Sequence, residues 1–444
     1  MKAALNGVLL RIVIVAALGG SLLGFDTAVI AGATHSLTEV FNLSPGRLGF
    51  TVSAALWGTV IGAMSAGVIE RRFGSRNSLL ILAACYLASA LGCAFSVNWT
   101  SLVVFRLVGG LGMGGSSVIA PVYIAEVSPA AWRGRLVGAF QVNIIVGILL
   151  AYLSNYLIGL ASLGRLEWRW QFGVAAIPAS VFLLMLFGNP PSARWLALRG
   201  RLDEARVVLK LLGSPNCDAE LAAMVASQGS NAGTRSERLF RWNYRRPIAL
   251  AVSLAMFNQL VGINAVLYYL NDIFAMAGFD RTSQNLQSVT VGGVMLMATL
   301  IALSLIDRFG RRKLLLAGSV GLAVCLAGMA AIFSLHTYER ALLACIVGYV
   351  GFFAFSQGAV IWVYLSEIFP SQVRAQGQSL GCSTHWIMNA VISGVFPLLA
   401  AKSHSGPFVV FLMMVILQFI AVYLFFPETS GVTLEAMQER MGVT

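Results

Sequence analysis

Long apolar stretches, separated by short polar segments, run along almost the whole chain. Each is about as long as the 20 or so mostly apolar residues with which a helix crosses a bilayer. Twelve such stretches are predicted, near residues 10–34, 48–69, 77–97, 100–127, 135–162, 168–188, 246–276, 285–306, 313–335, 340–367, 376–401 and 407–427. The pattern predicts an all-α membrane protein with twelve transmembrane helices. The first stretch is expected to be a retained helix, because no small-residue cleavage site follows it.

The segment 190–245 is the one long hydrophilic part of the sequence. Its apolar residues recur at helical spacing with charges between them, which predicts short amphipathic helices. These residues are Leu202, Ala205, Val208, Leu209 and Leu212. We therefore expect an N-terminal six-helix bundle over 1–189, a helical linker over 190–245, a C-terminal six-helix bundle over 246–427 and a tail over 428–444.

Composition supports a membrane protein and predicts its orientation. Hydrophobic residues make up 58% of the chain and charged residues only 11%, against about 25% charged in a soluble domain. A net charge of +12 would suggest nucleic acid for a soluble protein, but here the basic residues cluster between the spans. The expected partner is the lipid bilayer, with no nucleic acid. If both termini are cytoplasmic, 23 of the 30 Lys and Arg lie on that side and 6 on the other, which favours this orientation.

Cysteine and histidine are few and scattered. The six cysteines and four histidines form no CxxC pair or mixed ligand spacing, so a disulfide framework, a metal site and a cofactor are not expected. No nucleophile–base set lies at a plausible depth in the spans, so an enzyme is not expected either.

Two short words occur once in each half of the sequence. The pattern Tyr-x-x-Glu-x-x-Pro-x-x-x-Arg begins at Tyr123 and again at Tyr364, and Arg-Phe-Gly begins at Arg72 and again at Arg308. The words keep the same order and nearly the same offset, which predicts a duplicated six-helix unit. Such units are typical of secondary transporters, whose halves rock about a site near the midplane of the bilayer.

Further words follow one another in a fixed order along nearly the whole chain. They lie at 24–30, 106–110, 190–196, 259–264 and 427–435. With these words the chain resembles the sugar porters of the major facilitator superfamily, and it is most similar to their bacterial xylose– and glucose–proton symporters. The resemblance implies two pseudo-symmetric six-helix bundles of the major facilitator fold, alternating access, and import of a monosaccharide, a hexose or a pentose such as glucose or xylose.

The sequence departs from the family pattern at several positions. Arg71 stands where the first loop word usually has an acid, and Ser75 replaces a basic residue, whereas the second copy of this word is intact. The gate of the first half is therefore expected to be weaker or paired differently. Asn258 replaces a glutamine and Ala359 replaces a proline, which leaves the identity of the sugar open.

One acid and one base are predicted deep inside the apolar spans. Asp26 lies about eight residues, roughly 12 Å, from the outer end of the first span, and Arg106 about six residues, roughly 9 Å, from that of the fourth. A charge at such depth costs several kcal/mol unless it is paired, so the two are expected to meet. In proton-coupled members of the family an acid here carries the proton, which implies a proton-coupling role for the pair. The competing interpretation is a static pair that holds two helices together.

Amides and aromatic rings within the spans form the expected sugar site. A side-chain amide can donate one hydrogen bond and accept another from sugar hydroxyls, and aromatic rings cover the C–H face of the sugar ring. The competing interpretation is that such residues only bond neighbouring helices. The candidates are Gln141, Asn258, Gln259, Asn264, Tyr268, Gln357, Trp362, His385, Trp386 and Asn389.

Charged residues in and beside the loops form the expected cytoplasmic gate. Ion pairs at these positions can break and reform as the two halves exchange conformations. The candidates are Arg72, Glu126, Arg133, Asp307, Arg308, Arg311, Glu367 and Arg374.

The expected function is sugar–proton symport by a monomer in the plasma membrane, which in a bacterium is the inner membrane. A proton-independent sugar facilitator is the first alternative, and sugar uptake that a protonophore leaves unchanged would favour it. A drug–proton antiporter is the second alternative, although such proteins more often have an apolar cavity than this set of amides.

Overall fold

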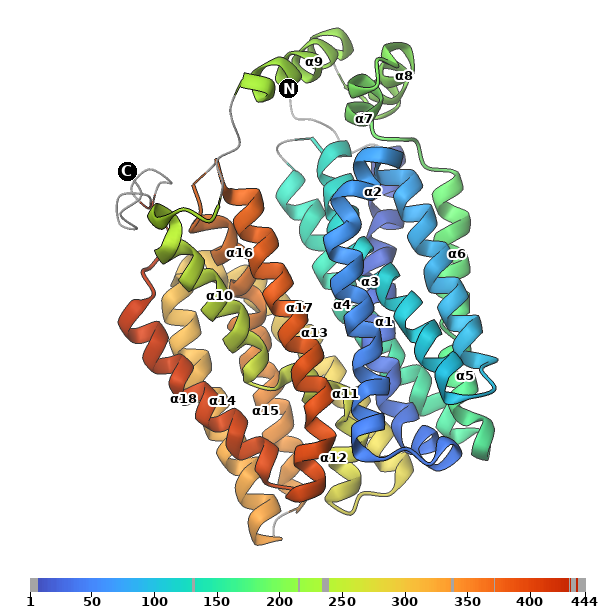
Figure 1. The fold of residues 1–444 in the computed structure, drawn as a ribbon, viewed down its shortest axis with the longest axis vertical. Coiled ribbons are helices and arrows are strands. Elements are labelled where there is room, and N and C mark those ends of the chain that lie inside the picture. The colour runs from blue at the N-terminus through green and yellow to red at the C-terminus, as the bar shows by residue number, and fades with distance from the viewer. Residues whose placement is uncertain are drawn as a thin grey trace. The chain divides into compact units, whose positions relative to one another are not determined.

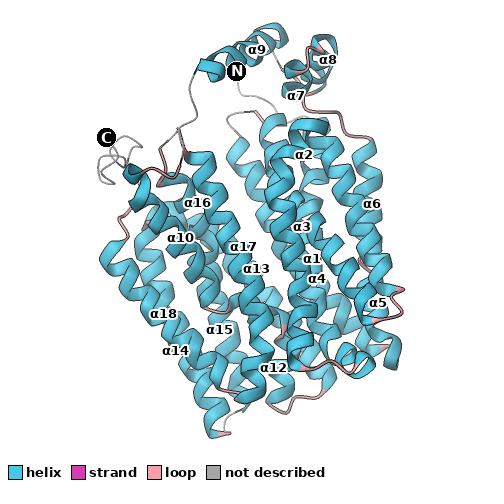
Figure 2. Ribbon diagram, in the orientation of Figure 1, coloured by secondary structure: helices cyan, strands magenta, loops and turns pink. Residues whose placement is uncertain are grey.

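The computed structural model describes residues 7–129, 132–214, 216–233, 239–336, 339–370, 372–430, 432 and 437. Within these ranges the side chains of 227–233, 303–308 and 375 are outside the description. Helices make up all of the regular structure in the described part, as Figures 1 and 2 show. The predicted all-α class is confirmed.

The helices of the first half and of the linker are α1 (Gly7–Phe41), α2 (Pro45–Ala94), α3 (Trp99–Val127), α4 (Arg133–Leu160), α5 (Glu167–Gly173), α6 (Ala176–Phe187), α7 (Ala193–Leu198), α8 (Leu202–Leu211) and α9 (Cys217–Gly233). Those of the second half are α10 (Arg245–Leu260), α11 (Ile263–Tyr268), α12 (Leu270–Met276), α13 (Arg281–Phe309), α14 (Arg311–Leu335), α15 (Leu342–Phe355), α16 (Gln357–Glu367), α17 (Arg374–Lys402) and α18 (Gly406–Phe425). Three short 3₁₀ turns, Gly164–Leu166, Trp242–Tyr244 and Glu339–Ala341, precede α5, α10 and α15.

Eleven helical segments in the described part are long and apolar enough to cross a membrane. One of them, α2, has 50 residues and contains two of the predicted spans, 48–69 and 77–97. Its direction changes at Gly74, whose φ of 77° and ψ of 160° are open to glycine and strained for other residues. With α2 counted as two crossings, each of the twelve predicted spans has a helical counterpart.

Three predicted spans are interrupted helices. The span 246–276 consists of α10, α11 and α12, which are separated at Gly262 (φ 90°) and at Tyr269. The span 340–367 consists of α15 and α16, which meet at Ser356. The span 168–188 consists of α5 and α6. Such breaks free backbone groups within the apolar layer, and these groups need partners inside the protein. At the first break the Tyr349 hydroxyl donates to the Val261 carbonyl at 2.8 Å.

The linker contains the amphipathic helices that its pattern predicts. The apolar face of α8 packs with α7 and α9 into a small core of its own, in which Ala205, Val208 and Leu209 are buried. Leu212 packs against this core, whereas Leu202 is exposed at the start of α8. The helical spacing therefore identified the buried face correctly except at its first residue.

The duplication predicted from the repeated words is present in the backbone and in side-chain contacts. Gly74 and Gly310, which end the two Arg-Phe-Gly words, have nearly the same φ and ψ, 77° and 160° against 83° and 157°. Tyr123 donates to the Pro190 carbonyl at 2.6 Å, and its counterpart Tyr364 donates to the Pro427 carbonyl at 3.2 Å. Each tyrosine therefore ties its repeat to the segment that follows the repeat's sixth span.

Backbone contacts group the chain into two compact units. Unit 1 comprises 1–27, 57–150 and 172–235, and unit 2 comprises 28–56, 151–171 and 236–444. The far ends of α1 and α4, the first part of α2 and part of α5 therefore belong to unit 2, together with the whole second repeat. This grouping places the segment 28–56 beside α17, where the Gly49 Cα approaches the Gly394 carbonyl so closely that a Cβ on Gly49 would collide with it.

Candidate functional site

The expected pair of buried charges is present in unit 1. Asp26 lies on α1 and Arg106 on α3, and the Arg106 guanidinium is 3.3 Å from Asp26 Oδ1. Only 3% of the Arg106 side chain and 14% of the Asp26 side chain are exposed. Asp26 Oδ2 is buried and accepts no hydrogen bond. One oxygen of the carboxylate is thus held by the guanidinium, and the other is available to a proton.

The surroundings of the pair are apolar apart from a few hydroxyls. The Phe172 ring lies 5.5 Å from the guanidinium carbon of Arg106, a distance at which a cation is attracted to an aromatic face. A cavity of about 10 Å³ adjoins Asp26, with Tyr86 and Ser89 in its wall. This volume suits about one water molecule. Gly109 allows the approach, because a Cβ there would press against Ser89 and lie close to Asp26 Oδ2.

Nine of the ten sugar-site candidates lie in unit 2, and several are bonded to one another. Gln259 is at the centre: its amide nitrogen is 3.1 Å from Asn258 Oδ1 and 3.3 Å from the His385 ring nitrogens. The Gln259 carbonyl oxygen accepts from the Asn264 amide at 2.9 Å. Because the Gln259 amide donates to the imidazole, the accepting ring nitrogen carries no proton. The break at Gly262 turns the chain so that Asn264 reaches back to Gln259.

Aromatic rings and further amides extend this cluster. The His385 ring lies 5.2 Å from both the Trp362 and the Trp386 rings. Trp386 is almost buried, whereas Trp362 is 38% exposed. The Asn389 amide donates to the Tyr268 hydroxyl at 3.2 Å. Amides, a phenol and two indoles on α10, α11, α16 and α17 thus come together within one unit.

Gln357 brings in a residue that the sequence analysis missed. Asn258 donates to the Gln357 backbone carbonyl at 3.4 Å, and the Gln357 amide donates to Gln418 Oε1 at 2.9 Å. Gln418 is fully buried on α18. The only sign of it in the sequence is a single amide within the apolar stretch 407–427, and no family motif lies in that stretch. The tenth candidate, Gln141, lies on α4 in unit 1 and is partly buried.

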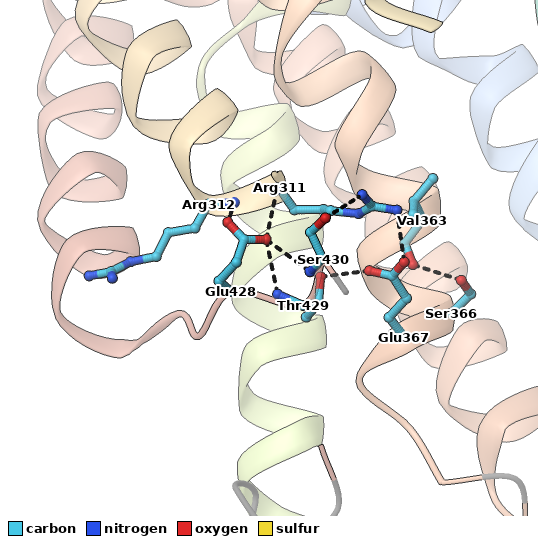
Figure 3. A network of polar contacts seen from close by, with 8 residues as sticks. All are labelled: Arg311, Arg312, Val363, Ser366, Glu367, Glu428, Thr429 and Ser430. Carbon is cyan, nitrogen blue, oxygen red and sulfur yellow. Dashed lines mark hydrogen bonds and ion pairs between the residues drawn. The ribbon is translucent and has the colours of Figure 1, made fainter. Parts of the chain in front are cut away.

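The gate candidates of the second repeat form a network at the ends of α14 and α16 (Figure 3). Arg311 pairs with Glu367 at 3.0 Å, and Glu367 also accepts from the Thr429 hydroxyl at 2.6 Å. Glu428 accepts from the Arg311 and Arg312 backbone amides at 2.8 and 3.1 Å, which caps the start of α14. The Tyr364–Pro427 bond and this cap attach the segment after α18 to the repeat.

The corresponding place in the first repeat has no ion pair of this kind among the described residues. Glu126 accepts from the Ser75 hydroxyl at 3.0 Å, and Ser75 lies 3.2 Å from Glu70. Ser75 is the residue that replaces a basic one in the family word, so a hydroxyl makes the contact at this position. An uncharged hydroxyl here contacts two carboxylates, whereas Arg311 brings a cation to Glu367.

The remaining gate candidates have other contacts or lie outside the description. Arg133 donates to the Ala125 carbonyl at 3.0 Å and Arg374 to the Phe369 carbonyl at 3.3 Å. Arg72 is exposed, with its guanidinium carbon 5.4 Å from the Phe73 ring. The side chains of Asp307 and Arg308 are outside the described residues.

A second polar cluster in unit 2 was not expected from the sequence. Glu167, at the start of α5, pairs with Arg281, at the start of α13, at 3.2 Å. Arg281 also donates to the Ser36 hydroxyl on α1 at 2.9 Å, and the Gln171 amide donates to Glu167 at 3.2 Å. We call Ser36, Glu167, Gln171 and Arg281 the polar clasp. It joins α1 and α5 of the first repeat to α13 of the second.

Comparison with known proteins shows the family to which the chain belongs. A family model described as "Sugar (and other) transporter" matches residues 12–441. The chain belongs to the sugar transporter family. It is therefore a multi-pass membrane transporter of the major facilitator type and not an enzyme.

Named relatives match this sugar transporter over nearly its full length. The D-xylose-proton symporter of Escherichia coli (strain K12) is 36% identical over 466 residues, covering 96% of this chain and 94% of the relative. The glucose facilitated diffusion protein of Zymomonas mobilis is 33% identical over 465 residues, covering 98% of both chains. The inward-open structure of the E. coli xylose transporter matches with a TM-score of 0.87 at 33% identity, covering 97% of this chain and 99% of that one.

Proposed function

We propose that this transporter imports a monosaccharide together with a proton by alternating access. The observation that carries the proposal is the buried Asp26–Arg106 pair, in which one carboxylate oxygen faces the guanidinium at 3.3 Å and the other has no hydrogen bond. A carboxylate in hydrocarbon costs several kcal/mol unless a cation compensates it. Such a residue therefore either takes part in proton coupling or forms a fixed ion pair that holds two helices together. The full-length likeness to the D-xylose-proton symporter of E. coli favours proton coupling.

The proton acts on the strength of this pair. Ionised Asp26 is attracted to Arg106, and because water is nearly absent this attraction holds α1 to α3. A proton on Oδ2 removes the charge of the carboxyl and weakens the attraction, while the guanidinium keeps its hydrogen bond to Oδ1. With sugar bound, the helices are then free to rearrange. The gradient is used because loading and release of this proton occur in opposite conformations.

The amide and indole cluster around Gln259 is the proposed sugar site. Each hydroxyl of a monosaccharide can donate and accept a hydrogen bond, and the amides of Gln259, Asn264 and Asn389 supply both kinds of partner. Two further polar atoms, Gln357 Oε1 and Gln418 Nε2, are buried without a partner in the described structure. Trp386 supplies an apolar face for the sugar ring. Asn258, Tyr268, Trp362 and His385 complete the site, and we propose Gln141 of α4 as the contribution of the first half.

Orientation and gating follow from charge. We propose cytoplasmic termini, because the basic residues favour that side. The bundles over 1–189 and 246–427 then move against each other, with the gate residues at the cytoplasmic ends of the spans. The polar clasp lies on the opposite, outer side. We infer that an intact clasp holds the outer gate closed.

A proton-independent facilitator is the second candidate. The glucose facilitated diffusion protein of Z. mobilis matches over 98% of both chains, so full-length similarity alone does not separate the two modes. In a facilitator the Asp26–Arg106 pair would be a fixed contact between helices.

Uptake into proteoliposomes tests the proposal. Labelled pentoses and hexoses are offered with and without an imposed gradient, inside alkaline. With one proton per sugar, a gradient of one pH unit supports at most about tenfold accumulation, whereas a facilitator only equilibrates. Asp26→Asn is expected to abolish accumulation and keep counterflow exchange. Asp280→Asn, which removes an exposed acid, is the matched control and is expected to accumulate normally. Accumulation by Asp26→Asn would contradict the proton-coupling role.

A further inference from the structure

A second buried acid lies on the half-helix α12, outside the Asp26–Arg106 pair and the sugar site. Asp272 is a partly buried residue in the first turn of α12, and its Oδ2 is buried and accepts no hydrogen bond. The Thr34 hydroxyl of α1 faces the carboxyl. Thr34 is 1% exposed and is also 3.4 Å from the Ala31 carbonyl of its own helix. The Thr34 hydroxyl donates to the Asp272 carboxyl, and this bond occupies only one of the two carboxyl oxygens.

No cation of the described structure pairs with Asp272. At the end of the neighbouring elements that lies next to α12, the charged and titratable groups are Arg281 and Asp280 at the start of α13, Tyr268 on α11, and His35 and Glu39 on α1. Arg281 is used in the polar clasp, and Asp280 caps α13 by accepting from the amides of residues 282 and 283. His35 and Glu39 face each other at 3.7 Å in an exposed position. An ionised Asp272 would thus have the Thr34 hydroxyl and the N-terminal end of α12 beside it, but no cation among the described residues.

Neighbouring polar groups are already bonded to one another. The Asn271 amide donates to Asn285 at 2.7 Å, and the Ser288 hydroxyl donates to Asn271 Oδ1 at 2.6 Å. These bonds fix α12 to α13 and leave none of the three groups for the adjacent carboxyl. Burying a charged carboxylate without a cation and with one bare oxygen is far more costly than burying the neutral acid.

The chain breaks on both sides of α12, so a movement of α12 relative to α1 would carry with it the part of α13 to which it is bonded. α12 is bounded by Tyr269 at its start and by a loop at its end, and the Gly262 break separates it and α11 from α10. In a state in which α12 lies away from α1, the Asp272 carboxyl would regain the water that it lacks when α12 packs against Thr34. The two positions of α12 therefore differ in their affinity for a proton.

We propose that Asp272 is a second proton-binding residue, which must take up a proton before α12 can close against α1. The inference rests on the proposed topology and transport cycle. The proton comes from the outer aqueous phase, becomes bound to a carboxylate oxygen as the gate closes, and returns to the same phase when the gate reopens. It is not carried across the membrane, so the accumulation ratio depends on Asp26 alone. External pH then controls outer closure through Asp272.

Infrared difference spectroscopy tests the protonation directly and does not need transport. The carboxylic-acid carbonyl band of purified Asp26→Asn in nanodiscs is compared at neutral pH with that of the same variant carrying Asp272→Asn. We expect the second substitution to remove part of the band. Asp26→Asn with Asp280→Asn is the matched control and is expected to leave the band intact. Thr34→Val, which keeps the acid but removes the facing hydroxyl, is expected to shift the band. An identical carboxylic-acid band with and without Asp272 would overturn the proposal.

Transport separates this inference from the proposed function. In the Asp26→Asn background, sugar exchange is expected to fall as the external pH rises, by at most about tenfold per unit because one proton is involved. Adding Asp272→Asn is expected to make exchange independent of external pH. Asp272→Asn alone is expected to keep uphill accumulation. If it abolishes accumulation while protein levels are normal, Asp272 carries the coupled proton and the division of roles is wrong. Accumulation by Asp26→Asn would instead refute the proposed function and leave the infrared result standing.

Discussion

The polar clasp predicts how far the outer gate opens when one of its charges is removed. The Glu167 side chain is 2% exposed and the Arg281 side chain 47% exposed, with 3.2 Å between their charged groups. Removing one partner of a fully buried pair costs about 3–5 kcal/mol, whereas an exposed pair contributes about 1 kcal/mol or less. Arg281 is half exposed, so we expect Arg281→Gln to destabilise the closed gate by about 2 kcal/mol. This corresponds to a shift of about 30-fold toward the open gate.

Thiol labelling from outside measures this shift. Ser53 is 2% exposed and lies beside Gly394, so a cysteine of nearly the same size there is covered while the gate is closed. In a background without the native cysteines, a membrane-impermeant maleimide is expected to label Ser53→Cys about 30-fold faster when Arg281→Gln is present. Adding Glu167→Gln removes the unpaired charge and is expected to recover part of the effect.

A matched control variant and an outcome that would contradict the reasoning complete the labelling experiment. Arg165 is an exposed arginine in the turn before α5, close to the clasp in sequence but without a place in it. Arg165→Gln removes the same charge and is expected to leave the labelling rate unchanged. If Arg281→Gln changes the rate no more than Arg165→Gln does, the clasp does not hold the gate and the reasoning is refuted.

Three further predictions concern the sugar site and the two gates. Gln259→Ala removes an amide with three partners and is expected to weaken sugar binding about 10- to 100-fold, measured with labelled sugar on folded protein. Gly49→Val places a side chain against the Gly394 carbonyl, so the closed outer state should become inaccessible and uptake should fall while outside thiol labelling rises. Arg311→Gln leaves Glu367, 28% exposed, without its cation and is expected to cost about 1–3 kcal/mol, seen as a lower unfolding temperature that Glu367→Gln partly restores.

Much of the fold could be predicted because the bilayer imposes a simple pattern on the sequence. Apolar length gave the spans, and repeated words gave the duplication that Gly74 and Gly310 now show as one backbone conformation used twice. The Asp26–Arg106 pair was predictable for a related reason, since two isolated opposite charges in hydrocarbon must find each other. The separation of α10, α11 and α12 was not predicted, because a single glycine in an apolar stretch is a weak signal.

The polar residues at the ends of the spans were harder to predict. Glu167 and Arg281 lie more than a hundred positions apart, and each reads as an ordinary loop charge near a membrane surface. Asp272 reads as the polar end of a span, because only the tertiary structure places Thr34 against it. Gln418 has no word around it and becomes a candidate only through its bond to Gln357. Contacts between distant segments decide these roles, and hydropathy does not report them.

The two repeats differ in how their gate residues are held, and this difference bears on their response to salt. Ser75 bonds Glu126 through a neutral hydroxyl, whereas Arg311 holds Glu367 through opposite charges that are partly open to water. Dissolved ions screen a partly buried pair much less than an exposed one, so their effect on Arg311 and Glu367 is small, and the uncharged donor Ser75 makes no ion pair that they could screen. The small loosening that a rise in ionic strength brings is therefore confined to the gate residues of the second repeat, so a molecule built from two copies of one unit responds to its ionic surroundings through one copy alone.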